Sequence, residues 1–416
     1  STLLNSLVGE ELAPTDAGEC THVVTWYRNG PTYRVTVDVD DGSRRQVPFH
    51  RDDGALELDL GDVPVERVRR IVVEWPSARL ATMTLIDTPG LDSVNADLSD
   101  RTRALLGAGD RSAQAPGDGG NSEADAVIYL MRHVHRTDLT FLEAFRDDAH
   151  AGASPISAIA VLSRADEVGA CRLDAMSAAN RIAENWRNDP RLRRLVQTIT
   201  PVAGLIAQAG ASLREAEFRA LATIAALPRP EIDALLLTAD RFVADNECGV
   251  TPIEREQLLA RLGVYGVRLA ISLIRLGVVT SASTMAPELT ARSGVTTLRS
   301  ILTTVLAERR EVLKARVAIA GLDRVLSTLP GPRLDPFRAE LERIEANAHE
   351  FAEVHLLNAL RAGDLRFRPA EIDELERLLG SIGAAPRSRL GVAEDGAVRD
   401  VVLAAVERWR ARAENP

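Results

Sequence analysis

The sequence predicts an α/β domain, in which a mostly parallel sheet is flanked by helices, followed by an α-helical stalk or bundle. Several short apolar segments in the first 210 residues each end in a turn with polar residues, which is typical of buried parallel strands. From residue 211 to residue 416 the apolar residues follow a helical period almost throughout. A chain of 416 residues also exceeds the size of one compact core. We therefore expect a head of residues 1–297, with a core of residues 1–210 and a helical segment of residues 211–295, and a helical stalk or bundle of residues 298–416.

Composition excludes several classes of protein. The net charge of −10 argues against a general nucleic-acid binder, whose surface is basic. The three cysteines show neither a disulfide framework nor metal-ligand spacing, which indicates a reducing compartment. The longest apolar stretch, residues 264–281, is interrupted by Arg268 and Arg275 and predicts a buried or amphipathic helix. No signal peptide is recognisable, so we expect a cytoplasmic protein.

The motif LIDTPGL, residues 85–91, is central to the head. Residues 83–86 have the character of a buried strand, and the following turn ends it. At such a strand end the carboxylate of Asp87 can hold Mg²⁺ through water, and Gly90 lets a backbone N–H approach a terminal phosphate. An Asp-x-Pro-Gly segment is also an ordinary turn, so its meaning depends on the motifs on either side.

The first residues, STLLNSLVG, predict a short amphipathic helix that ends at Gly9. They also fit the continuation of a phosphate-binding loop, Gly-x-x-x-x-Gly-Lys-[Ser/Thr], in which Ser1 is the hydroxyl ligand of Mg²⁺ and Thr2 lies beside it at the nucleotide. On this interpretation the given chain is a fragment, because its only lysine is Lys314, in a helical region. An ordinary amphipathic helix is the alternative.

Residues 13–21 form a turn-rich loop before the next strand, residues 23–27. A threonine in such a loop can close on Mg²⁺ and the γ-phosphate with its hydroxyl. We choose Thr21 for this role, with Thr15 as the second choice, against the alternative of a structural threonine. After this loop, residues 33–39 alternate apolar and polar side chains as an antiparallel strand does, and residues 68–75 predict a further strand.

The motif SRAD, residues 163–166, follows a buried strand predicted over residues 156–162. A carboxylate at the position of Asp166 can accept hydrogen bonds from N1–H and the exocyclic amine of guanine, while the aliphatic stem of Arg164 covers the base. After another strand, residues 196–200, the turn around Ala203 is placed to touch the guanine oxygen. A phosphate-loop helix, a switch threonine, DTPG, SRAD and a base-contacting turn follow one another along the chain. This order predicts a GTP-binding domain. His133 and His135 suggest a metal site, but surface histidines at a strand end are the plainer interpretation.

The second half is predicted as helical. A continuous helix over residues 298–329 would be about 48 Å long at 1.5 Å per residue, and residues 330–332 end it. A second amphipathic helix follows it. Residues 380–396 are rich in glycine, alanine and proline and predict a linker before a last amphipathic helix over residues 398–409.

At this point the chain resembles the bacterial dynamin-like GTPases, and most closely the mycobacterial isoniazid-inducible members. The resemblance rests on STLLNSLVG, APTDAGECTHVVTWYRNG, LIDTPGL, VLSRADEVGA, LGVYGVRLAISLIR and LKARVAIAGL. It implies GTP and Mg²⁺ as ligands, and it places the family's functional residues at positions identified above. The phosphate-loop serine, the switch threonine, the magnesium-side aspartate, the phosphate-sensing glycine and the guanine-reading aspartate correspond to Ser1, Thr21, Asp87, Gly90 and Asp166.

The resemblance also implies a mechanism. Two GTPase heads dimerise across their nucleotides, as a homodimer or with a related dynamin-like subunit, and the helical stalk acts as a lever on membrane lipids at the inner face of the membrane. Leu91 follows the DTPG motif where a water-positioning glutamine would be useful, so no catalytic residue is assigned.

Three functions remain open at this stage. The first is a GTPase that remodels or divides membranes, with residues 329–335 as a positional guess for the lipid-contacting segment and a plain connector as the alternative there. The second is a nucleotide-gated, weakly hydrolysing or non-hydrolysing scaffold that regulates another dynamin-like subunit. The third, a P-loop ATPase, is disfavoured by Asp166.

Overall fold

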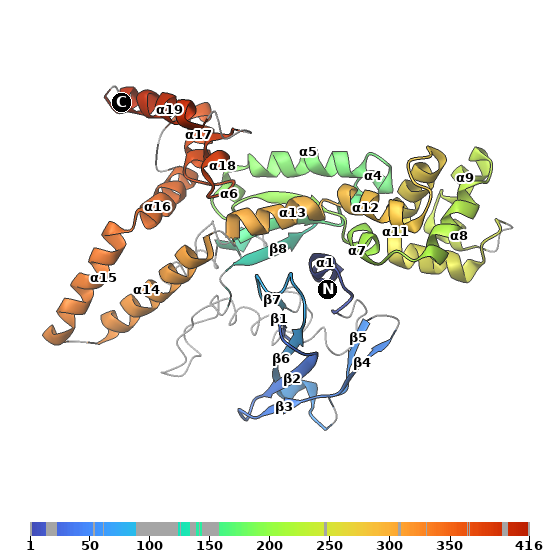
Figure 1. Ribbon diagram of the computed structural model, residues 1–416, viewed down its shortest axis with the longest axis horizontal. Helices are drawn as coiled ribbons and strands as arrows, with labels where there is room; N and C mark the ends of the chain where they lie inside the picture. Colours follow the sequence, from blue (N-terminus) through green and yellow to red (C-terminus); the bar gives the residue numbers. More distant parts are fainter. Residues whose placement is uncertain are drawn as a thin grey trace.

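The computed structural model of the chain describes residues 2–13, 23–52, 55–60, 62–88, 124, 126–133, 139–140, 142–143, 158–244, 248–306, 309–329, 331–363, 365, 367–392 and 398–414. In Figure 1 the sheets lie in the middle of the molecule, with a lobe of helices at one end and a helical hairpin with the C-terminal helices at the other. The described chain therefore combines an α/β region with a helical part.

The N-terminal sheet has five strands in the order β3-β2-β6-β1-β7. They are β1 (Thr25–Asn29), β2 (Arg34–Val39), β3 (Arg44–Gln46), β6 (Val68–Trp75) and β7 (Leu85–Asp87), and a separate antiparallel pair is formed by β4 (Phe49–Asp52) and β5 (Ala55–Leu58). β1 and β6 are parallel, whereas β2 is antiparallel to β3 and β6, and β7 is antiparallel to β1. This sheet is therefore mixed, and the expectation of a mostly parallel sheet is wrong for this half. The antiparallel strand predicted over residues 33–39 is confirmed as β2, which a short polar turn at residues 40–43 joins to β3 as a hairpin.

The second sheet is parallel, in the order β10-β9-β8, with β8 (Val127–Met131), β9 (Ala158–Ser163) and β10 (Ile199–Val202). β9 is buried over its first five residues, and β10 is buried over its whole length. Continuous apolar runs are expected where both faces of a parallel sheet are covered. The buried strands predicted from the sequence are confirmed here, with β10 beginning three residues later than expected.

Helix α1 (Thr2–Val8) packs between the two sheets. Its Leu3 and Leu7 belong to one apolar cluster with Leu85 of β7 and with Ile159 and Val161 of β9. Within the described residues, β7 and β8 are edge strands of their sheets, and residues of both line a cavity of about 560 Å³. Side-chain packing around α1 therefore holds the two sheets together.

The helical lobe follows the second sheet. After α4 (Val168–Cys171), α5 (Ala175–Arg187) and α6 (Pro190–Arg193), the lobe contains α7 (Gly204–Ser212), α8 (Glu215–Ala225), α9 (Arg229–Leu235), α10 (Ala239–Val243), α11 (Pro252–Arg275) and α12 (Ala282–Arg292). Among the described helices, α11 alone is long and apolar enough to cross a membrane, but half of its most apolar stretch is buried inside the structure. Its Leu258, Leu262 and Ala270 belong to the core of the lobe.

The expected continuous helix over residues 298–329 is interrupted. Helix α13 (Val295–Ile301) continues as a π-helical turn, Leu302–Leu306, and its Leu298 packs with Ile159 on the head. A separate helix, α14 (Arg310–Thr328), then leaves the head. A π turn shifts the register of a helix, and apolar periodicity alone does not reveal it.

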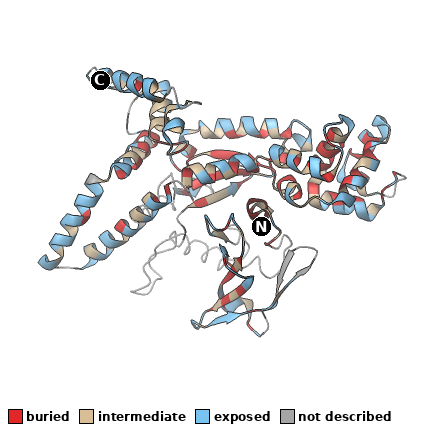
Figure 2. Cartoon of the chain, in the orientation of Figure 1, coloured by how far each residue is buried: buried red, intermediate tan, exposed pale blue. Residues whose placement is uncertain are grey.

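Helices α14 and α15 (Asp335–Asn347) form a hairpin through a short 3₁₀ turn, Pro332–Leu334, as Figure 1 shows. The chain returns through α16 (His349–Ala362) and ends with α17 (Pro369–Leu378), α18 (Pro386–Leu390) and α19 (Val398–Glu414). In Figure 2 buried residues concentrate in the sheets and the lobe, whereas the hairpin is mostly exposed.

The segment predicted as a linker, residues 380–396, is instead fixed by contacts as far as the structure describes it. The Nη2 of Arg309 donates to the carbonyl oxygens of Leu379 and Gly380, at 2.6 and 2.8 Å. The carbonyl oxygen of Ser381 accepts a hydrogen bond from Gln197, which lies 184 residues earlier. We call Arg193, Gln197, Arg361, Glu376 and Ser381 the joint, because they connect the head to the C-terminal helices.

Candidate nucleotide-binding site

Asp166 lies directly after β9. The chain leaves the strand through Arg164, which has left-handed backbone angles (φ 51°, ψ 41°), and enters a 3₁₀ turn, Ala165–Glu167. The left-handed residue reverses the chain direction within a very short distance. Asp166 is only 6% exposed, and burial raises the pKa of its carboxyl group. The carboxylate is therefore held at the end of the strand and largely out of bulk water.

The side chain of Arg164 lies at the surface. Its Nη1 is 3.1 Å from Oε1 of Glu167, and Oε2 of Glu167 is 3.3 Å from Nη2 of Arg132. The predicted role of Arg164 concerns its aliphatic stem, which would cover the base, and the pairing of its guanidinium with Glu167 leaves that role a prediction.

Ala203 follows β10 and precedes α7. It is fully buried, and its backbone N–H donates to the carbonyl oxygen of Ser293 at 2.9 Å. A Cβ placed on the next residue, Gly204, would lie 3.3 Å from Cγ2 of Thr2. The N-terminal ends of α1 and α7 therefore touch, and Thr2 lies beside Gly204, the residue after Ala203.

The same region includes Asp166. A Cβ placed on Gly263 of α11 would lie 3.3 Å from Cδ1 of Leu205 and 3.7 Å from Oδ2 of Asp166. Leu205 is the second residue of α7, directly after Gly204. Thr2, Ala203 and Asp166 thus gather around the start of α7.

Asp87 is the last residue of β7, where it is half-buried and opposite Thr25 of β1. Helix α1 connects Asp87 to the region of Thr2, because Leu3 of α1 packs in one cluster with Leu85 of β7. A carboxylate at a strand end has the oxygen ligands that Mg²⁺ prefers.

Several predicted residues belong to the part of the chain that the structure does not describe. Ser1, Thr15, Thr21, Gly90 and His135 lie outside the described residues, and so does any contact that they make. In the part of the chain that the structure describes, no group of three or more His, Cys, Asp or Glu side chains forms a metal-binding cluster.

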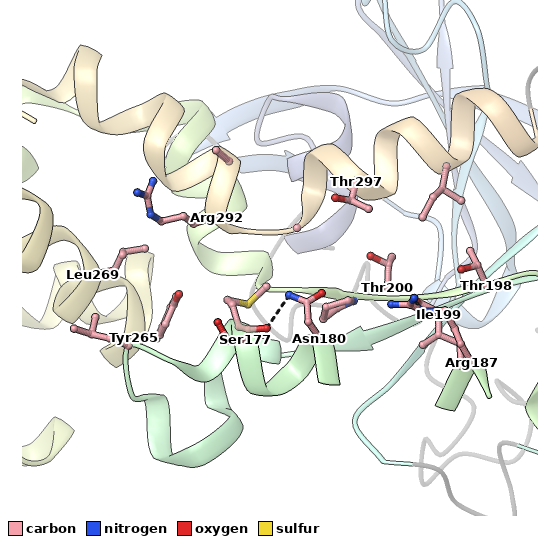
Figure 3. A pocket seen from close by; sticks show the side chains of 16 residues that line it. Ser177, Asn180, Arg187, Thr198, Ile199, Thr200, Tyr265, Leu269, Arg292 and Thr297 are labelled. Atoms are coloured by element: carbon pink, nitrogen blue, oxygen red, sulfur yellow. Dashed lines mark hydrogen bonds between the residues drawn. The ribbon is translucent and has the colours of Figure 1, made fainter. Parts of the chain in front are cut away.

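A second hollow lies along the outer side of β10. It is a cavity of about 530 Å³ lined from α5, β10, α11 and the α12–α13 connection, and Figure 3 shows its side chains. Nε of Arg187 donates to the carbonyl oxygen of Ile199 at 3.1 Å, and Pro201 has no N–H to offer. Tyr265 reaches this cavity from α11 and is 3% exposed, and burial together with the charge of Asp166 raises the pKa of its hydroxyl.

Comparison with known proteins shows the family of the chain. Residues 1–114 match the Dynamin family. The chain is 37% identical over 419 residues to the isoniazid-induced protein IniC of two strains of Mycobacterium tuberculosis, CDC 1551 / Oshkosh and H37Rv, and the match covers all of this chain and 83% of each relative. It is also 34% identical over 107 residues to a bacterial dynamin-like protein of Nostoc punctiforme, covering 23% of this chain and 15% of that protein.

The chain belongs to the bacterial dynamin-like proteins. The family is a GTPase family, so the region around α7 is the candidate site for its nucleotide. The match to residues 1–114 includes α1 and Asp87, whereas Asp166 and Ala203 lie beyond it.

Two solved structures described as an oligomerised bacterial dynamin pair for long-range sensing and tethering of membranes are also similar, at 12% and 13% identity. The comparisons cover 100% and 98% of this chain but 56% and 52% of those chains, so the chain spans about half their length. The TM-scores of 0.31 and 0.29 are too low to indicate a shared overall arrangement.

Two residues near the candidate nucleotide-binding site do not stand out in the sequence. Gly263 and Leu205 sit inside apolar segments with helical spacing, and the only signal is a glycine within the predicted helix. Their proximity to Asp166 depends on the packing of α11 against α7, which joins segments far apart in the chain.

Proposed function

We propose that this chain binds GTP with Mg²⁺ through its head and hydrolyses it to GDP and phosphate. The observation that carries the proposal is the buried carboxylate of Asp166 after the end of β9, which lies near Gly263 of α11, as Leu205 of α7 does. Guanine presents two N–H donors to a carboxylate, whereas adenine presents an acceptor at the corresponding ring nitrogen. Asp166 is the proposed guanine-reading residue, Thr2 and Ala203 are proposed nucleotide contacts, and Asp87 is proposed to hold Mg²⁺. Membership of the dynamin family supports this assignment.

The test is hydrolysis and binding of GTP and ATP by the full-length protein, with and without Asp166→Ala. We expect GTP to be preferred, and Asp166→Ala to weaken GTP binding by about 10- to 100-fold, since a hydrogen bond to a charged group contributes roughly 1.5–3 kcal/mol. ATP binding should change little. Equal use of GTP and ATP by the natural protein would refute the guanine assignment. Tight GTP binding without turnover would favour the nucleotide-gated scaffold that regulates a related dynamin-like subunit.

We also propose that the helical hairpin contacts membrane lipids, so that nucleotide turnover remodels or tethers a membrane to which the protein binds peripherally from the cytoplasmic side. Leu322, Val325 and Leu329 are 55%, 54% and 47% exposed and are spaced on one face at the end of α14. Phe337, at the start of α15, is 63% exposed. Exposed apolar side chains grouped in this way mark protein or membrane contacts.

The hairpin end has a defined shape. Nη2 of Arg338 donates to the carbonyl oxygens of Leu326 and Leu329, at 2.6 and 2.9 Å. These bonds connect α15 to the last turn of α14 across the connecting segment, which includes the exposed Arg333. A cation beside apolar side chains suits a surface of anionic phospholipid.

Co-sedimentation with anionic phospholipid vesicles tests this role. We expect the triple variant Leu322→Ser, Val325→Ser and Phe337→Ser to lose most vesicle binding, because burying each apolar side chain contributes about 1.5–3 kcal/mol. Leu237→Ser is the matched control, since Leu237 is 62% exposed and follows α9 in the helical lobe, at the other end of the molecule (Figure 1). Equal loss in both proteins, or no loss in the triple variant, would contradict the lipid-contacting role of the hairpin.

Family membership further supports pairing of two heads, either as a homodimer or with a related dynamin-like subunit. Pairing across the nucleotides would supply catalytic groups from the partner. This would explain how a site without an assigned water-positioning residue hydrolyses GTP.

A further inference from the structure

Helix α11 contains one residue with a backbone conformation that is not helical. Gly263 has φ 66° and ψ 172°, although the helix spans Pro252–Arg275. This region of backbone space is essentially restricted to glycine, because a Cβ there collides with the chain itself. Such an interruption lowers the stability of a long helix, and it persists where the surrounding packing requires it.

The interruption faces the candidate base site. A Cβ at position 263 would lie 3.7 Å from Oδ2 of Asp166 and 3.3 Å from Cδ1 of Leu205. The bare backbone of α11 therefore forms one wall beside the carboxylate, and the start of α7 forms the next. Asp166 keeps only 6% of its surface exposed.

Contacts on both sides of Gly263 fix this wall. Nη1 of Arg261 pairs with Oε1 of Glu11 at 2.7 Å, and its Nη2 donates to the carbonyl oxygen of Ser212 at 2.9 Å. A Cβ on Gly266 would lie 2.6 Å from Cγ2 of Ile206, so the backbone of α11 packs directly against a side chain of α7 there. The distance from α11 to Asp166 is therefore set by tight packing on either side.

We propose that Gly263 is a specificity-determining positioning residue of the base site: it lets α11 close against Asp166 and keep water away from the carboxylate. The inference rests on the proposed guanine-binding function. A carboxylate without water gains most from the two N–H donors of guanine, and it is left without a partner by adenine, which places an acceptor opposite it. Leaving a buried charged group without its hydrogen bonds is what makes a site reject the wrong ligand.

The test is Gly263→Ala, measured as the ratio of GTP to ATP affinity by competition with a fluorescent GDP analogue. Alanine cannot adopt these backbone angles without strain, so the interruption in α11 should relax, move α11 away from Asp166 and admit water. We expect the ratio to fall by about tenfold, mainly through weaker GTP binding.

Gly277→Ala is the matched control. Gly277 lies just after α11 with φ +68°, close to the +66° of Gly263, but nothing lies within 4 Å of its Cβ position. It is also a glycine with a positive φ, but it lacks the contact to Asp166. We expect Gly277→Ala to lower thermal stability and to leave the GTP to ATP ratio equal to that of the natural protein.

A second variant is needed in case Gly263→Ala does not fold. Leu205→Ala removes the side chain that α11 abuts without straining the backbone, and it should also lower the ratio. A natural protein that binds GTP and ATP equally overturns the proposed function together with this inference. A natural protein selective for GTP, with an unchanged ratio in a folded Gly263→Ala or in Leu205→Ala, overturns the inference alone.

Discussion

The parallel strands β9 and β10 have a buried charged group at each end of the pair, and the two groups differ in their partners. Asp166 lies at one end, and Arg361 of the joint lies at the other. At the C-terminal end of β9, Asp166 is buried, and no ion pair is found for it within the described residues. Before β10 begins, Nη2 of Arg193 pairs with Oε1 of Glu376 at 2.8 Å, and Nε of Arg361 lies 3.5 Å from the same oxygen. The side chain of Arg361 is only 5% exposed.

The buried guanidinium of Arg361 also donates hydrogen bonds within the joint. Nη1 of Arg361 donates to Oε1 of Gln197 at 3.0 Å and to the carbonyl oxygen of Val196 at 3.3 Å. The backbone N–H of Gln197 donates to Ala158, the first residue of β9, at 2.7 Å. The joint thus uses buried charge to fix one arrangement of the head and the C-terminal helices, whereas a buried carboxylate without an ion pair is a feature of binding sites.

The largest effect on stability is expected from Glu376→Ala in the joint. It removes the common partner of Arg361 and Arg193 and leaves the guanidinium of Arg361 buried without a counter-charge. Breaking a buried pair in this way costs about 3–5 kcal/mol. Chemical denaturation of the variant, compared with the natural protein, measures the loss.

Glu340→Ala is the matched control for that experiment. Glu340 pairs with Arg343 at 2.6 Å, but both side chains are more than half exposed, so we expect little change in stability. Similar losses of unfolding free energy in the two variants would show that the joint contributes no more to stability than a surface ion pair. The proposed difference between the two ends of β9 and β10 would then be wrong.

The sequence predicts the position of Asp166 after a buried strand but does not predict the joint, and the reason is the distance along the chain. Asp166 follows β9 within three residues, so a local pattern of apolar strand and polar turn is enough to find it. Ser381 meets Gln197 across 184 residues, and a segment rich in glycine and proline gives no local sign of that contact. The prediction of a linker over residues 380–396 was wrong for this reason.

Gly263 shows a related limit. Its neighbours have the spacing of an amphipathic helix, and α11 is indeed a helix on both sides of it. The backbone angles at one glycine depend on what lies opposite, here Leu205 and Asp166. The π turn Leu302–Leu306 is missed in the same way, because the order of apolar residues does not reveal it, although α13 before it packs on the head.

Asp166→Asn tests the other end of the strand pair. We expect it to raise stability, by less than Glu376→Ala lowers it. Burial raises the pKa of Asp166, so the folded state binds its proton more tightly than the unfolded chain does. The contribution of this group to stability is therefore full below the unfolded pKa of about 3.9 and is lost as the pH rises through the folded pKa. At neutral pH the asparagine avoids this loss, and the variant should unfold at a higher temperature than the natural protein. Thermal unfolding of both proteins at a series of pH values should show the difference shrinking as the pH falls through the raised pKa. A variant that is less stable than the natural protein at neutral pH would mean that the carboxylate is stabilised in the fold, and that the two ends of β9 and β10 bury charge in the same way after all.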